Sequence, residues 1–190
     1  LGRMVRGALD VDASLDESYT ISDVEEPVPF SFMGWDFTGR VDRVENQADR
    51  GKRIVDFKTG EVRKTGKTHR DNVLKALADP RNADWQIPFY IWAVAVRDGR
   101  FPGAFRYMAA KAGEEPLAIT LYTCRDENSI PAEAARSKRE SYLCENEVEE
   151  IMGRAVEVAE EMFSPKAHFD RTDDDDPCGL CEFAGLCKRE

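Results

Sequence analysis

The chain has 190 residues, which suits one domain and is long enough to bury a hydrophobic core. Hydrophobic residues make up 42% and charged residues 34%, as is ordinary for a globular protein, and no apolar run approaches the roughly 20 residues of a membrane-spanning helix. The net charge of −10 argues against tight, non-specific binding of nucleic acid, although the acidic residues gather in patches at 145–161 and 173–176.

Segments rich in β-branched and aromatic residues, separated by turn residues, predict six strands along the chain. They cover residues 19–24, 28–32, 34–45, 53–58, 104–109 and 117–123. Residues 1–15 are expected to form the end of a helix and a turn, and the basic segment 63–70 a flexible stretch. The many apolar residues of 84–97 predict a buried helix there. Within 133–163, apolar residues recur at steps of three and four residues, which predicts further helix.

This order of elements predicts an α/β (α+β) fold with a mixed central β-sheet flanked by helices. We expect a single domain over residues 1–190. In it, residues 19–123 hold the sheet and the helix at 84–97, residues 133–163 hold the C-terminal helices, and residues 164–190 form a cysteine-rich, metal-binding tail.

Two neighbouring strands carry a pattern of opposed charges. We expect residues 39–44 and 54–60 to form an antiparallel hairpin whose loop is centred on Asp49. The register then gives three facing pairs: Asp42 with Asp56, Arg40 with Lys58, and Val44 with Ile54. Because side chains alternate along a strand, the two acidic and the two basic members share one face.

The facing carboxylates of Asp42 and Asp56 can be interpreted in two ways. At an effective dielectric constant near 20 they would repel by about 3 kcal/mol, and a divalent cation such as Mg²⁺ would remove this penalty. With Lys58 beside them to orient a water molecule, they would supply the groups for phosphodiester hydrolysis. Alternatively, the strands present a solvated charged face on which Asp42 pairs with Arg40 and Asp56 with Lys58; the charges alone leave both interpretations open.

The motifs favour the first interpretation. Residues 39–44, G-R-V-D-R-V, and residues 55–60, V-D-F-K-T-G, resemble the two central motifs of the PD-(D/E)XK nuclease superfamily in its RecB/AddB-like branch. Gln86 and Tyr90 resemble the Q-x-x-x-Y motif of that branch and share one helix face. The resemblance implies site roles as follows: Asp42, Asp56 and the backbone carbonyl of Phe57 as metal ligands, Lys58 as a catalytic residue, and Gln86 and Tyr90 as groups that support the site or contact a DNA phosphate.

The resemblance also implies a function. It suggests a restriction-endonuclease-like core that acts as a Mg²⁺- or Mn²⁺-dependent deoxyribonuclease, as an exonuclease in DNA repair or recombination. DNA and a helicase domain or subunit of the same machine are the implied partners, in the cytoplasm. The resemblance covers about residues 19–187 and misses the first motif of the family, so we expect an absent upstream segment and poor cleavage by this fragment alone.

Three cysteines crowd the end of the chain, with the spacing C-x2-C-x5-C: Cys178, Cys181 and Cys187. This spacing predicts a zinc or iron–sulfur site. The tail resembles the iron–sulfur staple of AddB-type nucleases, which implies a 4Fe-4S cluster whose fourth cysteine lies upstream and is absent here. Cys124 and Cys144 are interpreted as small packing residues, although either of them, or His168, could replace the fourth ligand.

Two other functions remain open at this stage. The chain could be a catalytically weak or inactive nuclease-like domain that grips DNA or has a structural role, as the missing first motif suggests. It could also be a zinc-stabilised interaction module, in which Asp42 and Asp56 are incidental.

Overall fold

The computed structural model describes residues 2–14, 18–58, 62, 69–79, 84–110, 117–132 and 141–167. The chain divides into two compact units, Leu1–Val158 and Ala159–Glu190. Of the second unit, residues 159–167 are described, whereas the cysteine-rich tail, with Cys178, Cys181, Cys187 and His168, lies outside the described residues. Within the described part, no helix is both long and apolar enough to cross a membrane.

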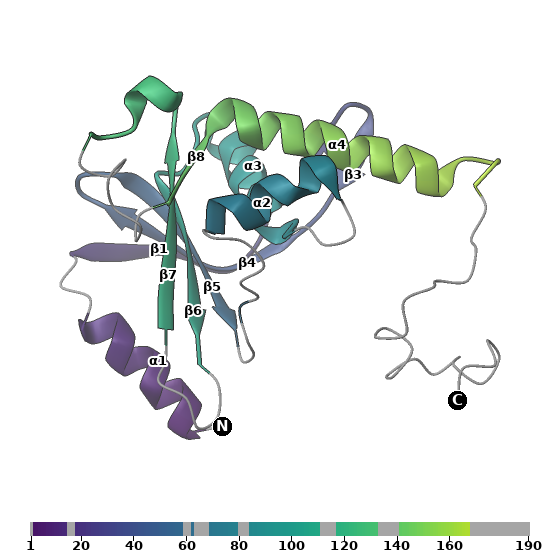
Figure 1. Cartoon of the computed structure of the whole chain (residues 1–190). Helices are drawn as coiled ribbons and strands as arrows, with labels where there is room; N and C mark the ends of the chain where they lie inside the picture. Colours follow the sequence, from purple (N-terminus) through teal and green to yellow (C-terminus); the bar gives the residue numbers. More distant parts are fainter. Residues whose placement is uncertain are drawn as a thin grey trace. The chain divides into compact units, whose positions relative to one another are not determined.

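A mixed six-stranded sheet forms the centre of the first unit (Figure 1). In spatial order its strands are β1 (Tyr19–Pro27), β4 (Arg40–Gln47), β5 (Gly51–Lys58), β6 (Ala104–Ala109), β7 (Leu117–Cys124) and β8 (Ser141–Cys144). The pairs β5–β6 and β7–β8 are parallel, and the other three are antiparallel. A separate hairpin consists of β2 (Phe30–Phe32) and β3 (Trp35–Phe37). The predicted mixed sheet flanked by helices is therefore confirmed.

The β4–β5 hairpin has the predicted register over residues 43–47, but the predicted pairs Asp42–Asp56 and Arg40–Lys58 are not part of its ladder, because away from the turn β4 separates from β5 before Asp42. Val44 pairs with Ile54, and the ladder runs from Arg43–Val55 to Gln47–Gly51. Gly51 has a φ angle of 75°, a left-handed conformation that glycine adopts without the steric cost of a Cβ atom. The turn at residues 48–50 and this glycine set the register, which determines which side chains share a face.

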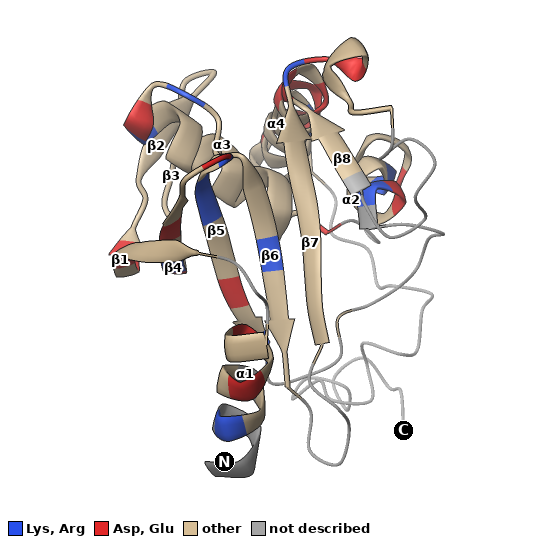
Figure 2. Cartoon of the chain, turned by 90° about the vertical axis from the view of Figure 1, so that its left-hand side faces the viewer, with Lys and Arg blue, Asp and Glu red and all other residues tan. Residues whose placement is uncertain are grey.

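The α-helices of the described residues are α1 (Gly2–Ser14), α2 (His69–Ala78), α3 (Gln86–Asp98) and α4 (Glu145–Phe163). Figure 2 shows α1 in front of the sheet and α3 and the first part of α4 behind it. The main core lies on the α3 side, and its buried residues include Val44, Ile54, Phe105 and Leu121 of the sheet, Ile87, Ile91 and Val94 of α3, and Val148, Ile151 and Met152 of α4. Burial of these apolar side chains is the main stabilising contribution to the unit.

The opposite face of the sheet buries charged residues under α1. Asp12 of α1 accepts a hydrogen bond from Arg43 (3.0 Å) and one from the hydroxyl of Tyr19 (2.7 Å). Arg53 donates to Glu45 at 2.6 Å, and Arg43 also forms an ion pair with Glu45. Burial opposes ionisation of Asp12, but the hydrogen bonds from Arg43 and Tyr19 outweigh it and hold the pKa of Asp12 below its ordinary value.

We expect Asp12→Asn to lower the free energy of unfolding by about 2–3 kcal/mol at neutral pH, because Arg43 stays buried with one anionic partner fewer. A carboxyl group with a depressed pKa in the folded state stabilises the fold above its unfolded pKa of about 3.9, and this stability is lost as the pH falls through the folded pKa. The difference between wild type and Asp12→Asn should therefore shrink below about pH 4.

Urea unfolding of both proteins between pH 2.5 and 7 measures this difference. Asp10→Asn is the matched control, since Asp10 is exposed on the same helix. A loss of stability that is equal at pH 2.5 and pH 7, or equal in the two variants, would contradict the role assigned to Asp12.

Three segments differ from the sequence-based expectation. The strand predicted at 34–45 is divided into β3 and β4, because Gly39 leaves the extended run and its carbonyl accepts a hydrogen bond from the Val28 amide (2.9 Å). Helix α2 begins at His69, within the stretch predicted to be flexible. The range 133–163, predicted to be helical, includes β8, which is stabilised by pairing with β7, a distant contact that no local periodicity signals.

Candidate active site

The candidate site lies where β4 leaves its partner β5. The β4–β5 ladder ends at Arg43–Val55, whereas β5 continues its parallel pairing with β6 as far as Lys58. In this opening the Oδ2 atom of Asp42 accepts a hydrogen bond from the backbone amide of Phe57 at 2.7 Å. The carboxylate of Asp42 is thereby held beside the Phe57 peptide, next in sequence to Asp56.

Asp56, Lys58 and Gln86 form a closed set of contacts. The Nζ atom of Lys58 lies 2.8 Å from Oδ2 of Asp56 and also donates to Oε1 of Gln86. The side-chain amide of Gln86 donates to Oδ1 of Asp56 at 2.7 Å and to the hydroxyl of Tyr90 at 3.3 Å. Gln86 therefore uses both ends of its amide group to fix the relative positions of the Asp56 and Lys58 side chains.

Helix α3 supplies Gln86 and Tyr90 because they are four residues apart on one face. The Tyr90 ring packs against Gly39, where an added Cβ atom would come within 3.0 Å of Tyr90 Cε1. A side chain at residue 39 would thus push the ring away, which explains the glycine that precedes Arg40 in this motif. The structure brings together all the residues that the sequence analysis selected in the first unit: Asp42, Asp56, Phe57, Lys58, Gln86 and Tyr90.

Around Asp56, among the described residues, the carboxylates of Asp42 and Asp84 outnumber the one ammonium group, that of Lys58. Asp56 is 3% exposed, and burial raises its pKa, against the opposing effect of Lys58; the nearby carboxylates of Asp42 and Asp84 raise it further. Its buried Oδ2 atom has the ion pair with Lys58 but no well-directed hydrogen bond. A buried carboxylate in this state is stabilised by an additional cation.

Two residues of this neighbourhood were missed in the sequence. Tyr107 of β6 pairs with Asp56 across the parallel ladder, and its hydroxyl donates to both carboxylate oxygens of Asp84, at 3.1 and 3.0 Å. The Nζ atom of Lys58 lies 5.3 Å from the centre of the Tyr107 ring, within cation–π range. Burial and the adjacent Asp84 raise the pKa of Tyr107, so its hydroxyl remains a donor. A strand that follows a helical connection usually pairs in parallel with the strand before that connection, and this rule could have indicated β6 as the partner of β5.

The donor set fits a hard divalent cation. Among the described residues, no group of three or more His, Cys, Asp and Glu side chains could hold a metal ion. Mg²⁺, however, is commonly bound by one or two carboxylates together with waters and substrate phosphate oxygens. Two carboxylates, those of Asp42 and Asp56, and the Phe57 carbonyl match that mode of binding, and the incompletely bonded Oδ2 of Asp56 is consistent with it.

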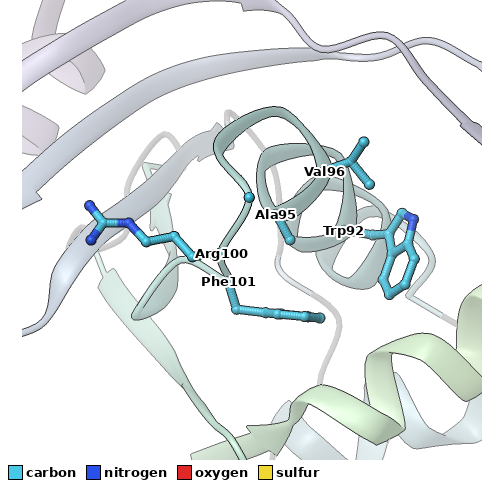
Figure 3. Close-up of a pocket in the computed structure, with 6 residues that line it drawn as sticks. Trp92, Ala95, Val96, Arg100 and Phe101 are labelled. Atoms are coloured by element: carbon cyan, nitrogen blue, oxygen red, sulfur yellow. The ribbon is translucent and has the colours of Figure 1, made fainter.

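A cavity of about 290 Å³ lies at the other end of α3 (Figure 3). It is lined by Trp92, Ala95, Val96, Gly99, Arg100 and Phe101. Gln86 is the first residue of α3 and Gly99 follows its last, so this cavity is separate from the carboxylate site.

The comparison with protein families decides the classification. The family model of the PD-(D/E)XK nuclease superfamily matches residues 1–188. The chain belongs to the PD-(D/E)XK nuclease superfamily. Its members are generally metal-dependent nucleases that act on DNA and typically use Mg²⁺ or Mn²⁺. The match extends to the first residue, so the expectation that the resemblance begins near Tyr19 was wrong, and α1 is part of the matched region.

One similar solved structure is that of SSO0001, which shares 10% sequence identity with this superfamily member at a TM-score of 0.44. The alignment covers 98% of this chain and 68% of that chain. No curated relative matches the sequence.

Proposed function

We propose that this superfamily member is a Mg²⁺- or Mn²⁺-dependent deoxyribonuclease domain of the RecB-like branch. The observation that carries the proposal is the geometry around Phe57: its amide holds the Asp42 carboxylate, while Asp56 and Lys58 on either side of it are tied to Gln86. A solvated charged face would leave Asp56 exposed and would pair Asp42 with Arg40, whereas Asp56 is buried and Asp42 accepts its hydrogen bond from the Phe57 amide.

The metal would be held by the carboxylates of Asp42 and Asp56 and by the carbonyl of Phe57. When bound, it supplies a Lewis acid that polarises the scissile phosphate and lowers the pKa of a water molecule. Asp42 already has one oxygen fixed by the Phe57 amide, so little reorganisation of this side chain is needed to bind a cation.

Lys58 would orient the attacking water and stabilise negative charge on the phosphate. The Lys58 side chain is 32% exposed, so it can contact a substrate while keeping its partner Asp56. Gln86 restrains the lysine from the other side, and Tyr90 restrains Gln86, so both α3 residues act as positioning residues in this proposal.

The motif order supports the RecB-like branch, because G-R-V-D-R-V, V-D-F-K-T-G and Q-x-x-x-Y follow one another at residues 39–44, 55–60 and 86–90. On this basis we extend the proposal to exonuclease action in DNA repair or recombination, alongside a helicase domain or subunit. For the tail, we propose that Cys178, Cys181 and Cys187 ligate an iron–sulfur cluster or zinc, on the strength of their spacing.

A cleavage assay on linear and covalently closed circular DNA tests the proposal. We expect Mg²⁺ or Mn²⁺ to support slow but measurable degradation of the linear substrate, the closed circle to persist, and a chelator to stop the reaction. Cleavage that continues in chelator, or no cleavage of either substrate with either metal, would refute metal-dependent nuclease activity. Cutting of the circle would refute only the exonuclease assignment.

A further inference from the structure

Two cysteines far from the carboxylate site lie in direct contact. Cys124 ends β7 and Cys144 ends β8, and they form the last pair of the parallel β7–β8 ladder. Their Sγ atoms are 3.2 Å apart, and the two residues are 8% and 1% exposed. The sequence interpretation of both as buried packing residues agrees with their burial, but they form a pair that the sequence did not reveal.

We propose that Cys124 and Cys144 form a modification site, a buried dithiol that a peroxide oxidises to a disulfide across β7 and β8. Neighbouring strands are about 4.8 Å apart, which lies within the Cα separations that a disulfide spans. The Sγ atoms need to approach by about 1 Å to reach bonding distance. Because each cysteine is the last residue of its strand, this movement does not disturb the ladder pairs that precede it.

The surroundings hold this pair in place. Cys124, Cys144 and Tyr142 form a small hydrophobic cluster of their own, against which Tyr122 and Ile130 pack. The backbone amide of Cys144 donates to Oε2 of Glu147 at 2.8 Å at the start of α4, and Glu147 also binds Arg70 of α2. A disulfide would therefore fasten the start of α4 to the end of β7.

The chemistry balances with a peroxide as the oxidant. The Cys124 sulfur, as the more exposed of the two, attacks one oxygen of hydrogen peroxide, the O–O bond breaks, and a sulfenic acid and water form. The Cys144 sulfur then attacks the Cys124 sulfur, the S–O bond breaks, and the disulfide and a second water are released. Two thiols are oxidised, one peroxide is reduced to two waters, and the two thiol protons end in those waters.

Burial sets the rate of this reaction. It raises the pKa of Cys124 to about 12, with Cys144 adding to the effect, and it raises the pKa of Cys144 as well. Since the thiolate is the reactive form, oxidation should be slow at neutral pH and should accelerate as the pH is raised. The pair then responds to sustained exposure to peroxide, while brief exposure leaves it reduced.

Peptide mapping of the full chain tests the proposal. The protein is treated with hydrogen peroxide, unfolded, alkylated and digested with trypsin. Cleavage after Lys and Arg places Cys124 in peptide 112–125, Cys144 in peptide 140–154 and the three tail cysteines together in peptide 172–188. We expect a linked species of peptides 112–125 and 140–154 that a reducing agent separates. Full alkylation of Cys124 and Cys144 after the tail peptide has been oxidised, or their linkage to peptide 172–188 instead, would overturn the proposal.

A thermal measurement complements the map. The new bond joins residues 20 apart in sequence, which restricts the unfolded chain, so we expect peroxide to raise the unfolding midpoint by about 5 °C and reduction to reverse the rise. Cys124→Ala and Cys144→Ser lack one partner each and keep the tail cysteines, so both should show no such rise. An equal, reversible rise in these variants would assign the effect to the tail and overturn the proposal.

Discussion

Asp56→Asn is expected to reduce metal-dependent DNA cleavage by a factor of about 10³, without making the protein less stable in the absence of metal. The loss follows because the amide is a poor ligand for a hard cation and carries no charge. Stability is retained because burial raises the pKa of Asp56, so its ionised form is disfavoured in the folded state at neutral pH. An amide of the same shape removes this unfavourable ionisation and leaves an oxygen facing Gln86.

Cleavage rates and thermal midpoints, each with and without Mg²⁺, measure the two effects. Mg²⁺ should raise the midpoint of wild type by mass action and leave that of Asp56→Asn unchanged. Asp49→Asn, in the exposed turn of the same hairpin, is the matched control and should behave as wild type. A variant that keeps more than about a tenth of the cleavage rate, or that gains as much stability from Mg²⁺ as wild type, would remove Asp56 from the proposed metal site.

Lys58→Met is expected to separate metal binding from cleavage. The ammonium group of Lys58 lies 2.8 Å from Oδ2 of Asp56, where it competes with a cation for the same oxygen. Its removal should leave Mn²⁺ affinity equal to that of wild type or several-fold higher. The cleavage rate should nevertheless fall by about 10²–10³, because no other group in the described contacts of Asp56 is placed to orient the water and offset charge on the phosphate.

Calorimetric titration with Mn²⁺ and single-turnover cleavage measure these two quantities on the same preparations. Lys52→Met is the matched control: Lys52 lies on the same strand but pairs with Asp98, away from the site. Loss of metal affinity in Lys58→Met would mean that the lysine holds the ligands in place, and an unchanged cleavage rate would exclude it from the chemistry.

The hairpin with its carboxylates could be predicted from the sequence because its determinants are local. A short polar turn that ends in Gly51, together with alternating side chains on both sides of it, is sufficient to set the register of Val44 against Ile54. The spacing of Gln86 and Tyr90 by four residues likewise placed them on one helix face before any packing was known. Recognition of the motifs then connected these local units to the nuclease superfamily.

The tertiary structure decided which distant residues joined them. Tyr107 and Asp84 meet near Asp56 only because β6, which follows α3, pairs in parallel with β5. Cys124 meets Cys144 only because β8 pairs with β7 as the edge strand of the sheet. Charged residues such as Arg43 and Glu45 usually indicate an exposed strand face. Both are buried here because α1 covers that face and Asp12 pairs with Arg43. Such contacts bring together residues tens of positions apart, and they pair each buried charge with an opposite one. Neither property leaves a periodic signal in the sequence.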